Sequence, residues 1–167
     1  MEGKPSLSEL STMTLDYFFP QIQLSEGQII NCIIYDTCGA GKLNRINESY
    51  YEKADAILLV YDITKRFSFE KIKNYYIGKI KELCKKDIVV SLVGNKLDRE
   101  SERKISYKEA KELAMKEKFL FNEVSCLKNL NVYETFETIV TETFNKTSFK
   151  KKRITEIQEK LNKYFNT

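Results

Sequence analysis

The sequence contains no histidine and no tryptophan. Without histidine, imidazole general-base catalysis and histidine-ligated metal sites are both excluded. The four cysteines, Cys32, Cys38, Cys84 and Cys126, form no CxxC pair, which argues against a zinc site. Because Cys32 and Cys84 lie in apolar stretches, we expect both to be buried free thiols of a protein in a reducing, cytosolic compartment.

Long apolar runs are absent too. A typical one, Ala54 to Tyr61, is far too short to cross a bilayer, and no secretory signal peptide is visible. The net charge of +4 is unevenly distributed, since seven basic and two acidic residues follow from Lys146 onward. The positive charge therefore belongs to the tail, and we expect no nucleic-acid partner for the rest of the chain.

Five segments have the composition of β-strands. Two of them flank a Glu26-Gly27 turn and are predicted to pair as a hairpin, in which Pro20 indicates an edge strand. The other three are short and continuously apolar, as expected where helices cover both faces of a sheet. The five predicted strands are Leu15 to Leu24, Gln28 to Tyr35, Ala56 to Tyr61, Ile88 to Val93 and Phe119 to Val124.

Helical periodicity occupies the segments between the apolar strands, with Ser68 and Ser106 as predicted N-caps. A hairpin followed by alternating strands and helices predicts an α/β fold, namely a doubly wound, mostly parallel sheet with one antiparallel edge hairpin. A basic joint at Ser148 to Arg153 then leads into a short amphipathic helix. We thus expect a domain over residues 8–147 and a basic tail over residues 148–167. The predicted helices of the domain are Ser68 to Lys85, Ser106 to Lys118 and Asn131 to Phe144.

Two short motifs follow apolar strands directly. The first is Asp36-Thr37-Cys38-Gly39, in which Asp36 is well placed to hold Mg²⁺ and Gly39 lets its backbone N–H approach a terminal phosphate. A strand-to-loop turn with an aspartate cap is the alternative interpretation. The carboxyl ends of parallel strands share one edge of a sheet, so we expect Asp36 to lie near the second motif.

The second motif is Asn95-Lys96-Leu97-Asp98. The carboxylate of Asp98 can accept hydrogen bonds from N1–H and the exocyclic amine of guanine, a pair of donors that adenine lacks. Asn95 can bridge the base and neighbouring loops, while the stem of Lys96 can lie across the ring. After the last strand, a backbone N–H of Ser125-Cys126 can meet the guanine O6, although Ser125 also suits an ordinary strand-to-helix turn.

These residues resemble the Ras superfamily, and its Rab branch most closely. The similarity covers residues 8 to 145, and the run from Asp36 to Thr64 follows a Rab pattern without a gap. The resemblance implies a guanine-nucleotide switch in vesicle traffic that uses GTP or GDP and Mg²⁺, with Thr12 matching a Mg²⁺-coordinating threonine. It further implies a cytoplasmic protein, peripheral to endomembranes, with Rab-type effectors and regulators as partners.

The resemblance also implies an effector surface made of Tyr17, Tyr35 and Tyr50. Position 35 is usually a tryptophan in Rabs, so this aromatic triad is altered. The alternative is that the three tyrosines simply pack between the hairpin and the helix that follows it. The basic tail ends without a lipid-accepting cysteine, so any contact with an anionic membrane is expected to be weak.

Two departures from the family bear on activity. The sequence contains no G-x-x-x-x-G-K-[ST] loop, and from its Met1 start we expect the family's first strand, phosphate loop and first helix to be missing. An incomplete gene model and a genuinely degenerate protein both account for this. In addition, Ala40 stands where the family has its water-positioning glutamine. We therefore expect weak phosphate binding and slow GTP hydrolysis, with a non-enzymatic pseudo-GTPase interaction module as the alternative.

Overall fold

The centre of the molecule is a three-stranded parallel sheet. The computed structural model describes residues 16–37 and 48–165, with only the helical backbone described for residues 149–165. The strands are β5 (Ala56–Asp62), β6 (Val89–Asn95) and β7 (Leu120–Glu123), in the order β5-β6-β7. These bounds confirm the three predicted apolar strands to within two residues. Every residue of β6 except Asn95 is buried, because β6 has a strand on each side and helices over both faces.

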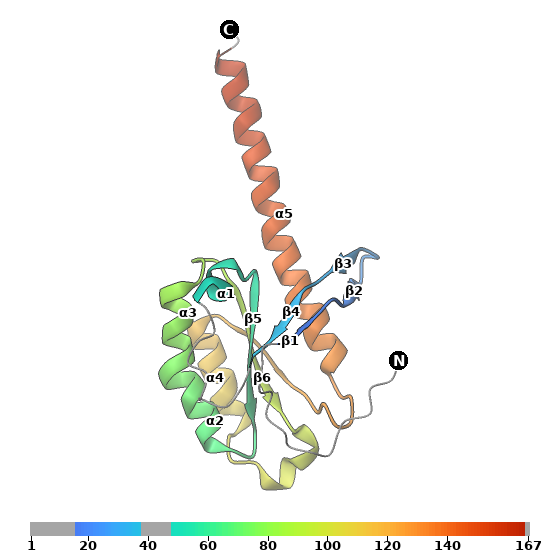
Figure 1. Cartoon of the computed structure of the whole chain (residues 1–167), viewed down its shortest axis with the longest axis vertical. Helices are drawn as coiled ribbons and strands as arrows, with labels where there is room; N and C mark the ends of the chain where they lie inside the picture. Colours follow the sequence, from blue (N-terminus) through green and yellow to red (C-terminus); the bar gives the residue numbers. More distant parts are fainter. Residues whose placement is uncertain (1–15, 38–47, 166–167) are drawn as a thin grey trace.

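Helices cover the two faces of this sheet (Figure 1). On one face, a helical stretch runs through α2, a π-helical turn η1 and α3, and α4 lies beside it; a short helix, α1, precedes β5. On the other face lies α5, which contacts β5 and β6. The bounds are α1 (Glu48–Lys53), α2 (Arg66–Lys71), η1 (Ile72–Tyr76), α3 (Ile77–Leu83), α4 (Tyr107–Glu117) and α5 (Val132–Phe165).

The main core lies between the sheet and helices α2 to α4. Leu92 is fully buried there, and the rings of Tyr61 and Phe69 meet edge to face with centroids 5.0 Å apart. Gly94 lies so close to this core that a Cβ at its position would be 2.7 Å from the Tyr61 hydroxyl oxygen. That hydroxyl is buried without a hydrogen-bond partner among the described residues. Residue 94 therefore has to be small for the core to close.

The predicted hairpin is present, but it is broken into two short pairs. β1 (Asp16–Phe18) pairs antiparallel with β4 (Ile34–Asp36), and β2 (Gln21–Gln23) pairs antiparallel with β3 (Ile29–Asn31). Pro20 interrupts the first arm, since proline has no N–H to give to a ladder. The tip turns at Gly27, whose φ of +88° favours glycine.

The prediction that this hairpin forms the edge of the parallel sheet is not confirmed among the described residues, although the predicted combination of a parallel sheet with antiparallel pairs is present. Within the described ranges its strands are hydrogen-bonded to each other and not to β5. The hairpin is instead attached to α5, against which Ile22 and Leu24 are buried. The Tyr133 hydroxyl donates a 2.8 Å hydrogen bond to the Gln23 carbonyl oxygen, and Ser25 donates one of 2.5 Å to Glu137.

α5 is a single helix of 34 residues. The helix continues through residues 148–153, where a joint was predicted, and the division into a domain over residues 8–147 and a basic tail over residues 148–167 stays a prediction. The whole span from Val132 to Phe165 contains neither glycine nor proline, so no residue in it stops a helix. Figure 1 shows the second half of α5 projecting beyond the rest of the molecule.

One of the two predicted caps is confirmed. The Ser106 hydroxyl accepts a hydrogen bond of 3.1 Å from the Glu109 N–H, as expected for the N-cap of α4. Ser68 is not an N-cap, because α2 begins at Arg66 and the capping position belongs to Lys65. The predicted helix is present, but its start was placed two residues too late. Apolar periodicity locates the middle of a helix better than its first turn.

Candidate functional site

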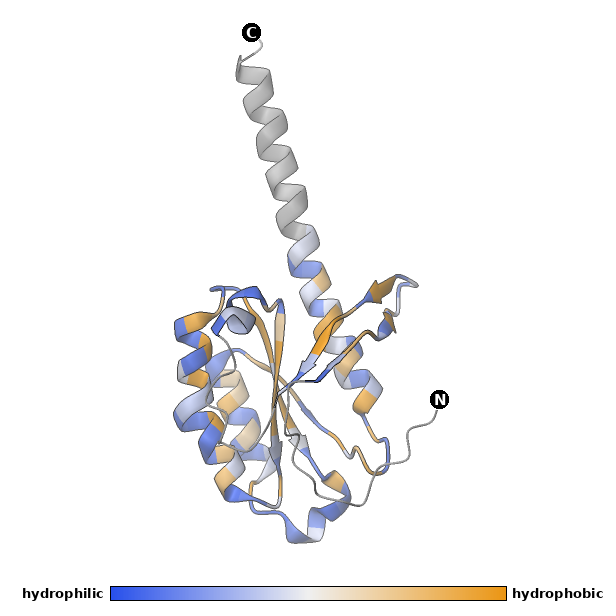
Figure 2. Ribbon diagram, viewed as in Figure 1, coloured by the Kyte–Doolittle hydropathy of each residue, from blue (hydrophilic) through white to orange (hydrophobic). Residues whose placement is uncertain are grey.

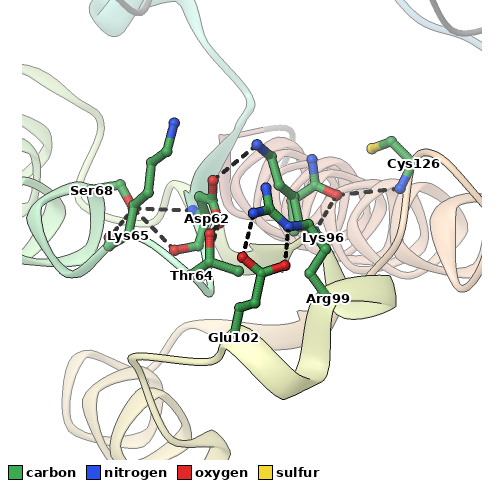
Figure 3. Close-up of polar contacts among 9 residues, drawn as sticks. Asp62, Thr64, Lys65, Ser68, Lys96, Arg99, Glu102 and Cys126 are labelled. Atoms are coloured by element: carbon green, nitrogen blue, oxygen red, sulfur yellow. Dashed lines mark hydrogen bonds and ion pairs between the residues drawn. The ribbon is translucent and has the colours of Figure 1, made fainter. Parts of the chain in front are cut away.

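Polar side chains gather where β5 and β6 end (Figure 3). Asp62 is the last residue of β5 and Asn95 the last of β6, and the two are opposite each other in the parallel register. The carboxyl ends of parallel strands meet at one edge, where ligands commonly bind in α/β proteins. The predicted base-reading motif therefore starts at the edge that the sequence pattern indicated.

Asn95 joins two loops. Its side-chain oxygen accepts hydrogen bonds from the backbone N–H groups of Lys96, at 2.7 Å, and Cys126, at 3.2 Å. Two backbone bonds reinforce the junction, from Leu97 N–H to the Val124 oxygen and from Val124 N–H to the Gly94 oxygen, at 2.9 and 2.8 Å. The loop after β6 is thus held against the loop after β7. Asn95 therefore links the two loops, and its predicted contact with a guanine base stays a prediction.

Asp98 and Ser125 are brought together by this junction. The Ser125 hydroxyl donates a 2.5 Å hydrogen bond to Asp98 Oδ1 and accepts one of 3.1 Å from the Lys128 N–H. The bond from Ser125 lowers the pKa of the Asp98 carboxyl, against a small opposing effect of desolvation. Ser125 is itself fully buried and is bonded in both directions to the backbone of Leu130. A charged carboxylate is therefore held in a fixed orientation at the edge of the site.

Lys96 has a strained backbone and a paired side chain. Its φ of 70° and ψ of 37° lie in the left-handed region, which residues other than glycine seldom adopt. Its ammonium nitrogen lies 3.0 Å from Asp62 Oδ2, so the Lys96 side chain reaches from β6 to the last residue of β5. Such strain persists only where surrounding contacts impose it, and the hydrogen bond from the Lys96 N–H to Asn95 is one such contact.

Asp62 is held by several groups. Partial burial raises its pKa, but hydrogen bonds from Thr64 and the neighbouring Lys96 ammonium outweigh this and lower it overall. The Thr64 hydroxyl and N–H both donate to Asp62 Oδ1, at 2.6 and 2.8 Å. The Asp62 N–H donates to the Ser68 hydroxyl, which in turn donates to the Lys65 carbonyl oxygen at 2.7 Å. The negative charge of Asp62 is thus stabilised at the same edge as that of Asp98.

Sequence reasoning did not assign Asp62 and Thr64 to the site. The signal was available, because Asp62 follows a predicted apolar strand just as Asp36 does, and both Asp62 and Thr64 lie in the run from Asp36 to Thr64 that resembles a Rab pattern. Beside them, Arg99 and Glu102 form an exposed ion pair with a nitrogen–oxygen distance of 2.8 Å (Figure 3). That pair is three residues apart within η2 (Leu97–Glu102), a spacing that sequence alone does not distinguish from many others.

Several other predicted site residues lie elsewhere or are not described. Asp36 ends β4 on the hairpin, which among the described residues is not hydrogen-bonded to the sheet that precedes Asp98, so the expectation of one common sheet is not confirmed. Its expected closeness to the base-reading motif stays a prediction. Thr12, Gly39 and Ala40 lie outside the described residues, and their assigned roles remain predictions as well.

The three tyrosines of the predicted effector surface form a chain of neighbours. Tyr17 and Tyr35 are paired across β1 and β4, and the rings of Tyr35 and Tyr50 have centroids 5.0 Å apart. Tyr17 and Tyr35 are nevertheless exposed, and of these two only Tyr35 has a ring contact with the helix residue Tyr50. Tyr17 and Tyr35 thus belong to a solvent-facing aromatic surface, and its role as an effector surface stays a prediction.

Acidic and cysteine side chains are the groups of the described residues that are suited to hold a metal ion. Those residues contain no group of three or more acidic or cysteine side chains arranged to hold a metal ion. Cys32 and Cys84 are half-buried rather than buried, and burial raises the pKa of both thiols, which disfavours their reactive thiolate form. Cys126 is exposed.

None of the described helices is both long and apolar enough to span a membrane.

Comparison with known proteins agrees with the site. A sequence model of the Ras family matches residues 3–159. "Ras-related protein RGP2" of Oryza sativa subsp. japonica is 38% identical over 139 residues, which are 83% of this chain and 63% of that protein. "Ras-related protein Rab-11C" of Dictyostelium discoideum is 30% identical over 146 residues, 87% of this chain and 64% of that protein.

A third relative, "Ras-related protein Rab-13" of Rattus norvegicus, is 35% identical over 138 residues, 83% of this chain and 67% of that protein. The chain thus spans less than two thirds of the length of the rice and Dictyostelium relatives. A family match over nearly the whole sequence, on a fold that joins Asn95, Asp98 and Ser125 at one edge of a parallel sheet, shows that the chain belongs to the Ras family of small GTPases.

Proposed function

We propose that this chain is a Rab-like guanine-nucleotide-binding protein that acts as a switch in vesicle traffic, with weakened phosphate binding and impaired GTP hydrolysis. The observation that carries the proposal is the hydrogen bond of 2.5 Å that fixes the Asp98 carboxylate through Ser125. Nucleotide and Mg²⁺ binding are general properties of the family, and the similar proteins named above are Ras-related or Rab proteins.

Selectivity for guanine rests on the chemistry of Asp98. A carboxylate accepts hydrogen bonds but cannot donate them, so it suits N1–H and the exocyclic amine of guanine and offers nothing to the edge of adenine. Asp98 is in this charged form at neutral pH, since the pKa of its carboxyl lies below the ordinary value of 3.8. Fixing the carboxylate before the base arrives reduces the entropy that binding would otherwise cost. The N–H of Cys126, held by Asn95 at 3.2 Å, lies on the loop that would face the guanine O6.

Phosphate binding is expected to be the weak part of the site. No G-x-x-x-x-G-K-[ST] motif occurs in the 167 residues, and that motif supplies the backbone donors, lysine and hydroxyl that surround phosphates in related proteins. In this proposal Thr12 and Asp36 would hold Mg²⁺, and the N–H of Gly39 would contact the terminal phosphate. Ala40 has no group to orient an attacking water, so hydrolysis would be slow.

A second candidate function is a non-enzymatic interaction module. Tyr35 and Tyr50 contact each other while Tyr35 and Tyr17 stay exposed, and exposed tyrosine clusters are typical of protein-binding surfaces. Rab-type effectors and regulators are the expected partners in either case. The seven basic residues from Lys146 onward support an additional, weak contact with an anionic membrane.

Calorimetric titration with GDP, GTP and ATP, each with and without Mg²⁺, separates the two functions. Mg²⁺-dependent, sub-micromolar binding of GDP but not of ATP supports the switch. Binding too weak to detect, by a chain whose circular dichroism and cooperative unfolding show a native fold, supports the interaction module. ATP binding as tight as GDP binding would contradict both.

Replacement of Asp98 by asparagine tests the base-reading role directly. Xanthine carries a carbonyl where guanine carries its exocyclic amine, so a donor at position 98 suits xanthine and a carboxylate suits guanine. Asp98→Asn should therefore weaken GDP binding at least about tenfold and strengthen binding of xanthosine diphosphate. Asp55→Asn is the matched control, because Asp55 is exposed at the opposite end of β5 and should leave both affinities unchanged.

Position 40 tests the hydrolytic part of the proposal. Ala40→Gln should raise GTP turnover only in a chain that also carries a phosphate-binding loop, since a positioned water is of no use without a bound γ-phosphate. A large rise in turnover in the 167-residue chain alone would show that phosphate binding is stronger than proposed.

A further inference from the structure

The side chain of Lys96 crosses the gap between two strands. Lys96 is the first residue after β6, yet its ammonium nitrogen lies 3.0 Å from Asp62 Oδ2, at the end of β5. Adjacent strands are about 4.8 Å apart, so the stem of Lys96 has to run along the edge of the sheet to reach that carboxylate. Figure 2 shows that the chain becomes hydrophilic where β5 and β6 end, a setting in which a lysine normally extends into water. The course of this side chain therefore depends on its ion pair.

Asp62 is the fixed member of the pair. Its Oδ1 accepts hydrogen bonds from the hydroxyl and the N–H of Thr64, at 2.6 and 2.8 Å, which leaves Oδ2 to face Lys96. The Asp62 N–H is bonded to the Ser68 hydroxyl at 3.1 Å. The side chain of Asp62 is 13% exposed, whereas that of Lys96 is 32% exposed. An anchored carboxylate thus determines where the longer and more exposed side chain ends.

Arg99, another cation near Asp62, has a different partner. Asp62 and Arg99 interact electrostatically, but the Arg99 guanidinium donates to both carboxylate oxygens of Glu102, at 2.8 and 2.5 Å (Figure 3). Such bidentate pairing holds a guanidinium in one orientation. Lys65 is also nearby in the sequence, but it is exposed. Lys96 is therefore the cation whose position Asp62 controls.

Lys96 is held at both of its ends. Its backbone has a φ of 70° and a ψ of 37°, and its N–H donates to Asn95 Oδ1 at 2.7 Å. Its ammonium group is held by Asp62. A lysine side chain that is free in solution loses rotamer entropy when a ligand orders it. In this chain most of that loss occurs on folding, so a ligand that contacts the stem binds with a smaller entropic cost.

The ordered stem complements the base-reading carboxylate. Asp98 follows Lys96 by two residues, and its Oδ1 accepts a 2.5 Å hydrogen bond from Ser125. A carboxylate recognises the edge of a guanine ring, whereas a methylene stem packs against the face of a ring. Because the Lys96 ammonium is held at Asp62, the part of Lys96 that remains for a base is its apolar stem.

We propose that Asp62 is a positioning residue for guanine binding, which holds the Lys96 side chain across the ends of β5 and β6 so that its stem receives one face of the base. The inference rests on the proposed binding of guanine nucleotides and adds a residue to it. If Asp62 only stabilised the ends of the two strands, its replacement would act independently of Lys96.

Calorimetric titration of variant chains with GDP tests the proposal. Asp62→Asn should weaken binding about tenfold, because the amide still accepts from Thr64 but presents a donor to the Lys96 ammonium. Lys96→Met keeps an apolar side chain without the ammonium group and should weaken binding to a similar extent. The double variant should bind no more weakly than either single variant, since both remove one contact. A double variant about a hundredfold weaker than the parent would overturn the proposal.

Inosine diphosphate, which lacks the exocyclic amine of guanine, separates the face of the base from its edge. Asp62→Asn should weaken binding of GDP and inosine diphosphate equally, because the stem contacts the ring face. Asp98→Asn should instead change the ratio of the two affinities, because that carboxylate accepts from the amine. A changed ratio in Asp62→Asn would place Asp62 at the edge of the base and overturn its positioning role.

Nitrogen-15 NMR of lysine ammonium groups tests the positioning in the free chain. The Lys96 signal, identified by its loss in Lys96→Arg, should be detectable in the parent and lost in Asp62→Asn, because an ion-paired ammonium exchanges its protons more slowly. Asp55→Asn is the matched control, since Asp55 forms the same kind of pair with Lys85, at 3.1 Å, near the opposite end of β5. It should leave the Lys96 signal and the GDP affinity unchanged. A Lys96 signal that persists in Asp62→Asn would contradict the proposal.

The same titrations distinguish this proposal from the proposed function. If the parent chain binds GDP and Asp62→Asn binds it equally well, only the positioning role is wrong. If the parent chain binds no guanine nucleotide, the proposed function is wrong and the positioning role fails with it, even where NMR shows that Asp62 orders Lys96.

Discussion

The parallel sheet and the hairpin both contain apolar strand residues, yet these residues are covered to very different extents. β6 is buried at six of its seven positions, because helices lie on both faces and a strand lies on each side. In the hairpin, only Ile22 is buried within a strand, with Leu24 beside the turn. The composition of a strand thus determines which of its side chains are suited to burial, and the neighbouring elements determine which of them are buried.

The comparison has an energetic meaning. Apolar burial contributes about 25 cal/mol per Å² removed from water, so the sheet and its helices hold most of the stability of the molecule. The hairpin is held to α5 by Ile22, Leu24 and two side-chain hydrogen bonds. Regions with few buried contacts open independently of the rest. We therefore expect two cooperative units, a stable sheet and a hairpin that opens more easily.

The largest effect should follow from truncating the centre of the sheet. Leu92→Ala removes a fully buried side chain from a core closed on both sides, which should lower the free energy of unfolding by about 3–4 kcal/mol. Urea denaturation followed by circular dichroism measures this loss. A cost below about 1 kcal/mol would mean that the core is loosely packed and the contrast between the two regions is false.

Adding one methyl group should cause a smaller loss of the free energy of unfolding. Gly94→Ala places a Cβ 2.7 Å from the Tyr61 hydroxyl oxygen, so the core has to shift. This shift should lower the free energy of unfolding by about 2 kcal/mol. Tyr61→Phe alone should be neutral or slightly stabilising, because that hydroxyl has no hydrogen-bond partner among the described residues. The double variant should recover part of the loss. No recovery would place the strain elsewhere than at this contact.

At the edge of the sheet, Asp62→Asn should lower the free energy of unfolding by about 1 kcal/mol at neutral pH, after allowing for solvent screening. The pKa of Asp62 is lowered in the folded chain, so its contribution is present above the ordinary value of 3.8 and is lost as the pH falls through the folded pKa. The stability curves of the two chains should therefore separate above about pH 4 and converge in acid. A constant difference at every pH would exclude the ionised carboxylate as the cause.

The smallest global effect should come from the hairpin. Ile22→Ala should leave the global free energy of unfolding within about 0.5 kcal/mol of the parent, because the hairpin opens before the sheet does. Hydrogen exchange at Ile30, its cross-strand partner, should nevertheless become about tenfold faster, while Leu92 stays unchanged. Equal acceleration at both amides would show that the two regions unfold as one.

Much of this arrangement was predictable from local patterns. Continuous apolar runs gave β5, β6 and β7 with nearly correct bounds, and Ser106 followed by Glu109 marked the start of α4. The site motif was placed correctly because Asn95 ends a strand, and side chains at the carboxyl ends of parallel strands lie at one edge. These signals are local, so a single sequence carries them.

The parts that sequence reasoning missed depend on contacts between distant segments. Whether the hairpin pairs with β5 depends on contacts between distant segments. The residue pattern of neither strand encodes those contacts. Ser68 resembled an N-cap by type, yet it donates to the Lys65 carbonyl and accepts from Asp62 instead. The role of Asp62 is not apparent from the sequence, because its ion-pair partner Lys96 is 34 positions away. The two side chains come together only across the β5–β6 ladder.

The unbroken α5 acts as a spacer of fixed length. Its 34 residues span about 51 Å at 1.5 Å per residue, and because it starts beside the loop after β7, it ends on the side of the molecule opposite the polar edge. Anything attached to its far end is consequently held away from that edge. Since each residue turns the helix by about 100°, removing one residue would rotate such an attachment to another side, whereas removing seven would shorten the spacer with almost no rotation.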